Sequence, residues 1–243
     1  MKFLGKNVQI SDGAQIGKNV RIGDNTVIYD NVEIGDDSII ANNCVIGEPT
    51  ADYYSTESHQ NKPTVIGKNA LIRSHAIIYE DVQIGEGFQT GHRLTIREKS
   101  IIGNHCGIGT NCDLQGYLSI GDHCHFHSEV HICQFSTIGD FVFIYPGVVL
   151  ANDKYPPTKQ VIGPTIGDYT QIGIQSSVIG DVKIESNCLI GAQSVVTKDF
   201  EAYAFILGSP AKQKGDIRGL KSETGEPLYP WKDRFSRGMP WQD

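Results

Sequence analysis

The sequence predicts an all-β fold built as a solenoid of short stacked strands, followed by a short C-terminal tail. The first observation is a strict period: an apolar residue or Thr recurs at every sixth position from Ile66 to Leu150 without a slip. A helix repeats near 3.6 residues and an amphipathic strand at two, so neither produces a period of six. The second observation is composition, because 27 glycines and an Ile/Val-rich set of aliphatic residues suit a β protein with many tight corners. A fixed short period indicates units that bury their faces only by stacking on one another.

The hexads fall into three blocks that order the chain. The first block starts at Leu4 and ends at Ile46, the second runs from Ile66 to Leu150, and the third runs from Ile166 to Val196. Typical hexads read IGKNVR and IGDNTV, with Gly, Asn and Asp at the places where the chain must turn sharply. A second, smaller residue follows four positions after each aliphatic residue and is expected to point inward as well. The three blocks together contain 29 hexads.

Two aperiodic stretches separate these blocks and are predicted to be insertion loops, at residues 47–64 and 151–165. The first is polar, with two prolines and two tyrosines. Ile66 follows Ile46 by 20 positions, which is two more than three hexads. The loop therefore adds two residues if it takes the place of three hexads, and more residues if it takes the place of fewer.

Composition excludes several classes of partner. The net charge is −7 and no long run of Lys and Arg is present, so we expect no nucleic acid. No stretch reaches the roughly 18 apolar residues of a membrane span, and residues 1–10 lack the apolar core of a signal peptide, so we expect a cytoplasmic chain with no membrane partner. Five of the six cysteines occupy the small inward position and are predicted to be core filler, without disulfides or zinc. These five are Cys44, Cys106, Cys112, Cys124 and Cys188.

The hexads and the segment that follows them resemble the hexapeptide-repeat acyltransferase superfamily. That segment reads GAQSVVTKDF from Gly191 and GSPAK from Gly208, close to the exit sequence of the family. The resemblance implies a left-handed parallel β-helix with three hexads in each triangular coil, and therefore about ten coils. It places the catalytic domain at residues 1–200 and a C-terminal extension at 201–243. The extension contains Trp231 and Trp241 and is expected to pack on the prism or on a neighbouring subunit.

The same resemblance implies a homotrimer that uses acetyl-CoA as co-substrate and needs no metal. In the family, acyl-CoA lies in the groove between two prisms, where backbone groups of the last coils hold pantetheine and basic residues hold phosphates. By position, the residues expected to bind the coenzyme are Gly173, Ile174, Ala192, Thr197, Lys198 and Lys212.

The proton-transfer step is where this sequence departs from the family pattern. Amino-sugar N-acetyltransferases of the superfamily carry a general-base His at the place that Gln134 occupies here, in VHICQFSTIG, and an amide cannot take the proton. The candidate bases are His92 and Glu98, in TGHRLTIRE, with Gln134 as a possible donor to the thioester oxyanion. Alternatively, the departing CoA sulfur takes the proton itself.

The segment NDKYP resembles the loop "TNDxYPR" of nucleotide-3-amino-sugar N-acetyltransferases, with Ala151 and Pro157 in place of the flanking Thr and Arg. In those relatives the loop reaches over the cleft and contacts the sugar. The resemblance therefore implies a nucleotide-sugar substrate whose amino group is acylated. The residues expected to bind it are Arg93, Arg97, His127, Asn152, Asp153 and Tyr155.

Three alternatives stay open from the sequence. One is O-acetylation of a sugar or serine-type hydroxyl, which needs a base more than an amine does. Another is a non-catalytic prism of the carbonic-anhydrase-related kind. The third is a zinc hydratase, which would need three of the five histidines between His105 and His131 to converge at a subunit interface.

Overall fold

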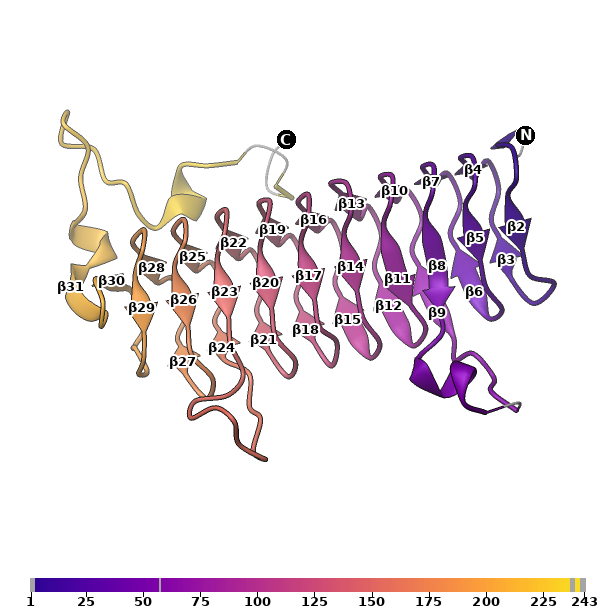
Figure 1. The fold of residues 1–243 in the computed structure, drawn as a ribbon. Helices are drawn as coiled ribbons and strands as arrows, with labels where there is room; N and C mark the ends of the chain where they lie inside the picture. The colour runs from indigo at the N-terminus through magenta and orange to yellow at the C-terminus, as the bar shows by residue number, and fades with distance from the viewer. Residues whose placement is uncertain (1–2, 57, 237–238, 241–243) are drawn as a thin grey trace.

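The chain folds as a left-handed parallel β-helix of about 11 turns, so the predicted fold class is confirmed. A computed structural model describes residues 3–56, 58–236 and 239–240. Successive short strands belong in turn to three sheets, here called A, B and C, which form the faces of an elongated prism (Figure 1). The corners between consecutive faces are called the A–B, B–C and C–A edges.

Sheet A contains β1 (Phe3–Leu4), β4 (Arg21–Ile22), β7 (Ile39–Ile40), β10 (Leu71–Ile72), β13 (Gln89–Thr90), β16 (Gly107–Ile108), β19 (His125–Phe126), β22 (Phe143–Ile144), β25 (Gln171–Ile172), β28 (Leu189–Ile190), β30 (Ala204–Leu207) and β31 (Lys212–Asp216). Sheet B contains β2 (Gln9–Ile10), β5 (Val27–Ile28), β8 (Val45–Glu48), β11 (Ile77–Tyr79), β14 (Thr95–Ile96), β17 (Asp113–Leu114), β20 (His131–Ile132), β23 (Val149–Leu150), β26 (Ser177–Val178) and β29 (Val195–Val196). Sheet C contains β3 (Gln15–Ile16), β6 (Val32–Ile34), β9 (Thr64–Ile66), β12 (Val82–Ile84), β15 (Ser100–Ile102), β18 (Ser119–Ile120), β21 (Thr137–Ile138), β24 (Thr165–Ile166) and β27 (Lys183–Ile184). Three 3₁₀ helices complete the described chain: η1 (Ala51–Tyr54), η2 (Ile217–Gly219) and η3 (Trp231–Asp233).

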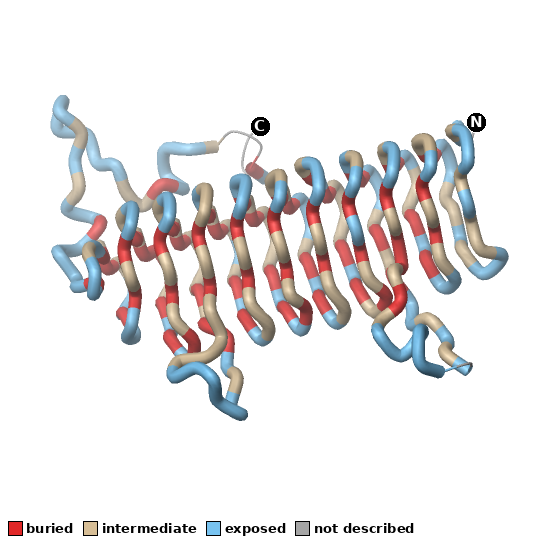
Figure 2. Tube along the Cα trace, in the orientation of Figure 1, coloured by how far each residue is buried: buried red, intermediate tan, exposed pale blue. Residues whose placement is uncertain are grey.

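The hexad residues fill the interior of the prism. Ile108 pairs with Phe126 across β16 and β19, so each coil contains three hexads. From Val20 onward both inward positions of the hexads are almost completely buried, and Figure 2 shows them as red segments that recur along the coils after the first. Burying one large aliphatic side chain contributes about 1.5–3 kcal/mol, so stacking of coils supplies the main stabilisation. The five cysteines predicted as filler are buried, and burial raises the pKa of Cys112 and of Cys188 to about 11.

The two predicted insertion loops are confirmed. Ile34 pairs with Ile66 in sheet C, so the first loop lies within a single coil and lengthens that coil alone. Ile138 pairs with Ile166 in the same sheet, so the second loop likewise belongs to one coil. Strand β8 continues to Glu48, and β24 begins at Thr165, so each loop is slightly shorter than the aperiodic sequence.

The prism ends differently at its two ends. At the N-terminal end Leu4, Ile10 and Ile16 remain partly exposed. At the other end Ile190 pairs with Ile206, so sheet A continues past residue 200 and is closed by the antiparallel strand β31. The C-terminal tail then returns over sheet A (Figure 1), where Trp231 packs against Phe143 with ring centroids 4.8 Å apart. The predicted packing on the prism is confirmed for Trp231, while Trp241 lies outside the described residues.

Candidate functional site

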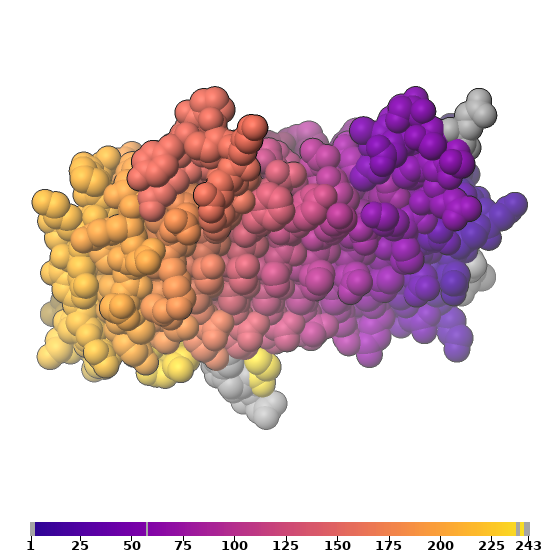
Figure 3. Space-filling model, turned by 90° about the horizontal axis from the view of Figure 1, so that it is seen from below, coloured from indigo at the N-terminus to yellow at the C-terminus, as the bar shows by residue number. Residues whose placement is uncertain are grey.

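Both insertion loops leave the prism at the same edge. Each follows a strand of sheet B and precedes a strand of sheet C, so both project from the B–C edge. The loops rise from coils that are five apart, which at roughly 4.8 Å per coil is about 24 Å. Figure 3 shows the two loops as separate prominences with a saddle of prism surface between them. We take this saddle as the candidate site.

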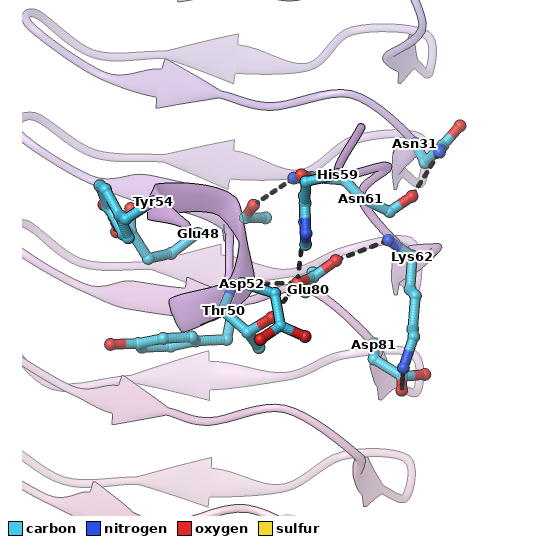
Figure 4. A network of polar contacts seen from close by, with 12 residues as sticks. Asn31, Glu48, Thr50, Asp52, Tyr54, His59, Asn61, Lys62, Glu80 and Asp81 are labelled. Atoms are coloured by element: carbon cyan, nitrogen blue, oxygen red, sulfur yellow. Dashed lines mark hydrogen bonds and ion pairs between the residues drawn. The ribbon is translucent and has the colours of Figure 1, made fainter. Parts of the chain in front are cut away.

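The first loop is fixed to the prism through a buried carboxylate, that of Glu80 (Figure 4). Its Oε1 accepts hydrogen bonds from the backbone N–H and the hydroxyl of Thr50, at 2.9 and 2.7 Å, and Oε2 accepts one from the N–H of Lys62 at 2.7 Å. His59 Nε2 lies 3.2 Å from Oε1. Burial raises the pKa of Glu80, but the hydrogen bonds from Thr50 and Lys62 outweigh it, so the pKa is lower than usual. The carboxylate therefore organises a loop that would otherwise leave its backbone unsatisfied.

A cavity of about 270 Å³ lies between the first loop and the B–C edge. Arg97 reaches the carboxylate of Glu98 with both Nε and Nη2, each at 3.1 Å. The guanidinium also lies over the ring of Tyr79, 5.4 Å from its centroid. Glu98 is thus a paired carboxylate whose oxygens are both engaged. This arrangement favours a binding role for the Arg97–Glu98 pair over the base role predicted for Glu98 alone.

The floor of the saddle carries two exposed aromatic rings. Tyr117 and Phe135 pack against each other with centroids 5.2 Å apart, and Lys99 places its ammonium 4.6 Å from the Tyr117 centroid. Gln134 is half-buried next to Phe135, in the same column as Asn152 one coil further on. Sequence reasoning predicted this column but missed the aromatic pair, although rings at the same corner of consecutive coils were a visible signal.

The second loop forms the other wall of the saddle. The Asp153 carboxylate accepts hydrogen bonds from the N–H groups of Thr158 and Tyr155, at 2.8 and 3.1 Å, and the backbone bond from Thr158 is the main reason that the pKa of Asp153 is lowered. Tyr155 is 75% exposed. Asp153 is therefore occupied in shaping its own loop, while Asn152 and Tyr155 remain available to a ligand. A small cavity of about 160 Å³ lies among these residues.

His92 lies at a different edge from Glu98. It follows β13 at the A–B edge, where its Nδ1 is 3.3 Å from the Ser74 hydroxyl. Arg93 beside it donates from Nε to Asn111 Oδ1 at 2.7 Å. The structure therefore separates the two predicted bases by one full face of the prism, which is sheet B.

Five of the six residues predicted for the coenzyme lie at the two edges of sheet B, and Lys212 lies beyond the last full coil. Gly173, Ile174 and Ala192 lie on the A–B edge in the last coils, and Ile174 is 44% exposed. A side chain at position 173 would approach the backbone N of Ala192 to 2.7 Å, so these coils are closely stacked there.

The remaining coenzyme candidates lie closer to the C-terminal end. Thr197 and Lys198 are exposed at the B–C edge, and Lys212 begins β31 beyond the last full coil. The Lys198 ammonium lies 5.5 Å from the centroid of Phe200. Gly173, Ile174 and Ala192 therefore lie across sheet B from Thr197 and Lys198, while Lys212 lies in sheet A. The binding role of all six residues stays a prediction.

His127 lies on the opposite side of the A–B edge, facing sheet A. Its ring stacks on Tyr145 with centroids 5.1 Å apart, at the mouth of a cavity of about 450 Å³ between sheet A and the C-terminal tail. The structure does not bring His127 to the saddle. In the described part of the chain, no three His, Cys, Asp or Glu residues lie together in a way that could hold a metal ion.

The outer face of sheet B connects the two edges and carries one feature that the sequence did not single out. His131 Nδ1 lies 3.3 Å from Asp113 Oδ2 across neighbouring strands. Both side chains point outward, because Ile132 and Leu114 beside them are fully buried. Asp113 and His131 occupy equivalent outward positions in consecutive coils, so the register of the repeat contains the signal for this pair.

Comparison with known proteins gives one family and a consistent fold. The family described as "Bacterial transferase hexapeptide (six repeats)" matches residues 13–48 and 163–198. A serine acetyltransferase of Staphylococcus epidermidis is 42% identical over 103 residues, which cover 38% of this chain and 46% of that protein. A serine acetyltransferase of Staphylococcus aureus is 42% identical over 82 residues, 32% of this chain and 38% of that protein. The chain thus spans about half the length of these relatives or less.

The fold is also found among solved structures. A UDP-N-acetylglucosamine acyltransferase has a TM-score of 0.56 at 23% identity, and it matches 88% of this chain over 74% of its own. LpxA from Acinetobacter baumannii has a TM-score of 0.50 at 22% identity, with the same coverage. At these identities the likeness establishes the fold alone. Among the described residues, no helix is long and apolar enough to cross a membrane.

Proposed function

We propose a function from the premise that the chain belongs to the bacterial transferase hexapeptide family: it transfers an acetyl group from acetyl-CoA to the amino group of a nucleotide-linked amino sugar. The reaction would be a direct attack in a ternary complex. The observation that carries the proposal is the saddle on the B–C edge, which combines cations, aromatic rings and two bounding loops on a hexapeptide prism.

The donor would lie along the last coils. The family match at residues 163–198 contains Gly173, Ile174 and Ala192, and the exposed Ile174 and Ala192 would contact a pantetheine arm. Lys198 and Lys212 are exposed near the C-terminal end and suit phosphate groups. In the homotrimer that we propose, a second prism would complete the groove that holds acetyl-CoA.

The acceptor would lie in the saddle. Lys99 supplies positive charge for a diphosphate beside the Arg97–Glu98 ion pair, and Tyr117 and Phe135 offer flat faces to a base or a sugar ring. Asn152 and Tyr155 line a cavity in the second loop, which bounds the saddle, and would contact the acceptor from that side. A nucleotide sugar presents this combination of chemical groups.

The prism would accelerate the reaction chiefly by holding the two substrates together. The amine would attack the thioester carbonyl, and the Gln134 amide would donate a hydrogen bond to the oxyanion. Loss of one such donor typically costs about 100–1,000-fold in rate. Gln134→Ala is therefore expected to lower kcat by that order.

A hydroxyl acceptor is the second candidate. It is favoured by the serine acetyltransferases of Staphylococcus, which match at 42% identity over 82 to 103 residues. A hydroxyl needs proton removal during attack, so this candidate depends more strongly on a base.

Thiol release from acetyl-CoA tests the proposal. The full chain would be assayed with UDP- and dTDP-linked amino sugars, with the corresponding hydroxyl sugars, and with L-serine. Turnover of an amino sugar, and no turnover of its hydroxyl counterpart, is the expected result. Turnover of L-serine or a hydroxyl sugar, without turnover of an amino sugar, would establish the second candidate. If no acceptor of either kind causes thiol release, both candidates are overturned.

A further inference from the structure

We propose that His131, held by Asp113 on the outer face of sheet B, is the general base of the acyl transfer. This inference rests on the proposed function, because it assigns a residue to the step that the family position, Gln134, cannot perform. The observation behind it is the Asp113–His131 contact itself.

The contact is built on rigid elements. Strands β17 and β20 are neighbours in sheet B, with Asp113 paired to His131 and Leu114 to Ile132. Because Leu114 and Ile132 are completely buried, the two preceding side chains must project outward, side by side. Nδ1 of the imidazole lies 3.3 Å from Oδ2 of the carboxylate. A carboxylate at one ring nitrogen fixes the ring orientation and leaves Nε2 to face a substrate.

The surroundings of the pair leave the imidazole reachable. The two side chains are 34% and 41% exposed. The next strand, β23, presents the uncharged Val149 beside His131, and β14 presents Thr95 on the far side of Asp113. The nearest titratable group that follows it in the chain is Cys133, whose pKa is raised by burial and by Asp113, so that it stays a neutral thiol. Asp113 is therefore the charged group that governs His131.

The location of His131 suits a general base that acts beside Gln134. His131 precedes Gln134 by three positions in the same coil, on the face that joins the A–B edge to the saddle. Of the earlier candidates, the His92 imidazole contacts a serine hydroxyl, and Glu98 is bound by both arms of Arg97. The other described histidine in contact with a carboxylate, His59, is 11% exposed and anchors the first loop. Within the described chain, His131 alone combines a carboxylate partner with an open face beside the predicted oxyanion donor.

The chemistry balances as follows. The neutral amine nitrogen forms a bond to the thioester carbon while the carbonyl electrons move to oxygen. Nε2 of His131 takes one proton from that nitrogen. Collapse of the intermediate restores the carbonyl, breaks the C–S bond and releases the CoA thiolate, to which the imidazolium returns the proton. The products are the N-acetyl sugar and CoA–SH, with His131 again neutral. Asp113 is a positioning residue that steadies the imidazolium.

His131→Asn in the full chain tests the assignment. With the best amino-sugar acceptor of the thiol-release panel, kcat/KM is expected to fall at least 100-fold, since a positioned general base contributes about 100–10,000-fold. KM for acetyl-CoA is expected to change less than about threefold. His105→Asn is the matched control, because His105 lies on the C–A edge in a stack with His123. Its activity should equal that of the wild type, and circular dichroism should show both variants folded.

Asp113→Asn supplies an independent readout. Asp113 acts through the imidazole, so Asp113→Asn is expected to lower kcat with little change in either KM, and Asp113→Glu is expected to restore part of the lost kcat. A purely structural role for Asp113 would raise KM as kcat falls and would give no rescue by Glu.

The outcomes separate the two proposals. If the wild type turns over an amino sugar but His131→Asn keeps more than a tenth of its kcat/KM, the inference is overturned while the function stands. A wild-type kcat in Asp113→Asn likewise overturns it. Near-complete loss in His92→Asn or Glu98→Gln, with His131→Asn active, assigns the base to those residues instead. Absence of turnover by the wild type overturns the function and the inference together.

Discussion

The first coils and the central coils of this prism use the same hexad but place different residues at the corners. In the first block the non-glycine corner residues with positive φ are Asn or Asp, namely Asn7, Asn19, Asn25, Asn31, Asp37 and Asn43. In the central block most of the positive-φ positions hold residue types other than Asn and Asp. The positive-φ residues of this block are Asn69, His75, Asp81, Arg93, Lys99, His105, Asn111, Tyr117, His123, Glu129, Phe135 and Phe141. All adopt the left-handed conformation that costs other L-residues roughly 1–2 kcal/mol and that Asn and Asp tolerate best.

The difference shows which coils are optimised for turning and which serve another purpose. The first block reinforces its corners with amide ladders, such as Asn7 to Asn25 at 3.1 Å and Asn25 to Asn43 at 3.2 Å. The central block accepts backbone strain at Tyr117 and Phe135 and exposes both rings in the saddle. Strained positions that the fold does not require are a reason to infer function. Three of the central residues other than Asn and Asp, namely Lys99, Tyr117 and Phe135, lie at the saddle, and the other such residues lie at the A–B and C–A edges.

The largest expected effect tests whether the inward aliphatic residue of a hexad contributes equally to the free energy of unfolding in both regions. Ile96→Ala removes a side chain that is fully buried between covered coils, and it should lower the free energy of unfolding by about 2–5 kcal/mol. Ile16→Ala, in the first coil, removes a partly exposed side chain and should cost less than half as much. Urea unfolding followed by circular dichroism measures both. Equal losses would show that the end coils are as tightly packed as the centre.

A second effect concerns the junction between the two regions, where Glu80 holds the first loop. Glu80→Gln replaces charge-assisted hydrogen bonds with weaker ones and should cost about 2 kcal/mol. The pKa of Glu80 is lowered in the folded state, so its contribution is fully present above the unfolded value of about 4.3 and is lost as pH falls through the folded value. The difference in unfolding free energy between wild type and Glu80→Gln should therefore be constant near neutral pH and shrink in acid.

Limited proteolysis gives the structural counterpart of that measurement. In Glu80→Gln the loop should be cleaved faster between residues 49 and 63 than in the wild type. Lys68→Ala, which breaks only an exposed pair with Glu86, is the matched control and should leave the loop resistant. A loop equally resistant in Glu80→Gln would show that the backbone contacts suffice without the charge.

The fold could be predicted almost completely from the sequence, because a period of six fixes the register of every strand. The same register placed Glu98, Gln134 and Asn152 in one column, and the strand pairing confirms that placement. Handedness came only from family resemblance, since right-handed crossovers are the general rule.

The chemistry of the site was less predictable, for physical reasons that particular residues illustrate. That Arg97 would turn back on its neighbour Glu98 depends on side-chain conformation, which no periodicity encodes. The packing of Trp231 against Phe143 could not be predicted, because Trp231 belongs to a tail without a repeat. Glu80 gave no signal in the sequence, because its partners Thr50 and Lys62 come from a loop without a register.

The smallest expected change in stability is also the one that separates turning from function most directly. Asn25→Ala removes a residue suited to positive φ and its ladder bonds, and should cost about 1–2 kcal/mol without affecting turnover. Phe135→Asn relieves strain of about that size but loses the ring contact with Tyr117, worth about 0.5–1.5 kcal/mol, so unfolding should change by less than about 1 kcal/mol. If Phe135 binds the acceptor, KM for the nucleotide sugar should nevertheless rise at least tenfold, with KM for acetyl-CoA unchanged. A Phe135→Asn variant with unaltered kinetics would mean that the central corners vary without functional reason, and the contrast between the two regions would then reflect drift in the repeat.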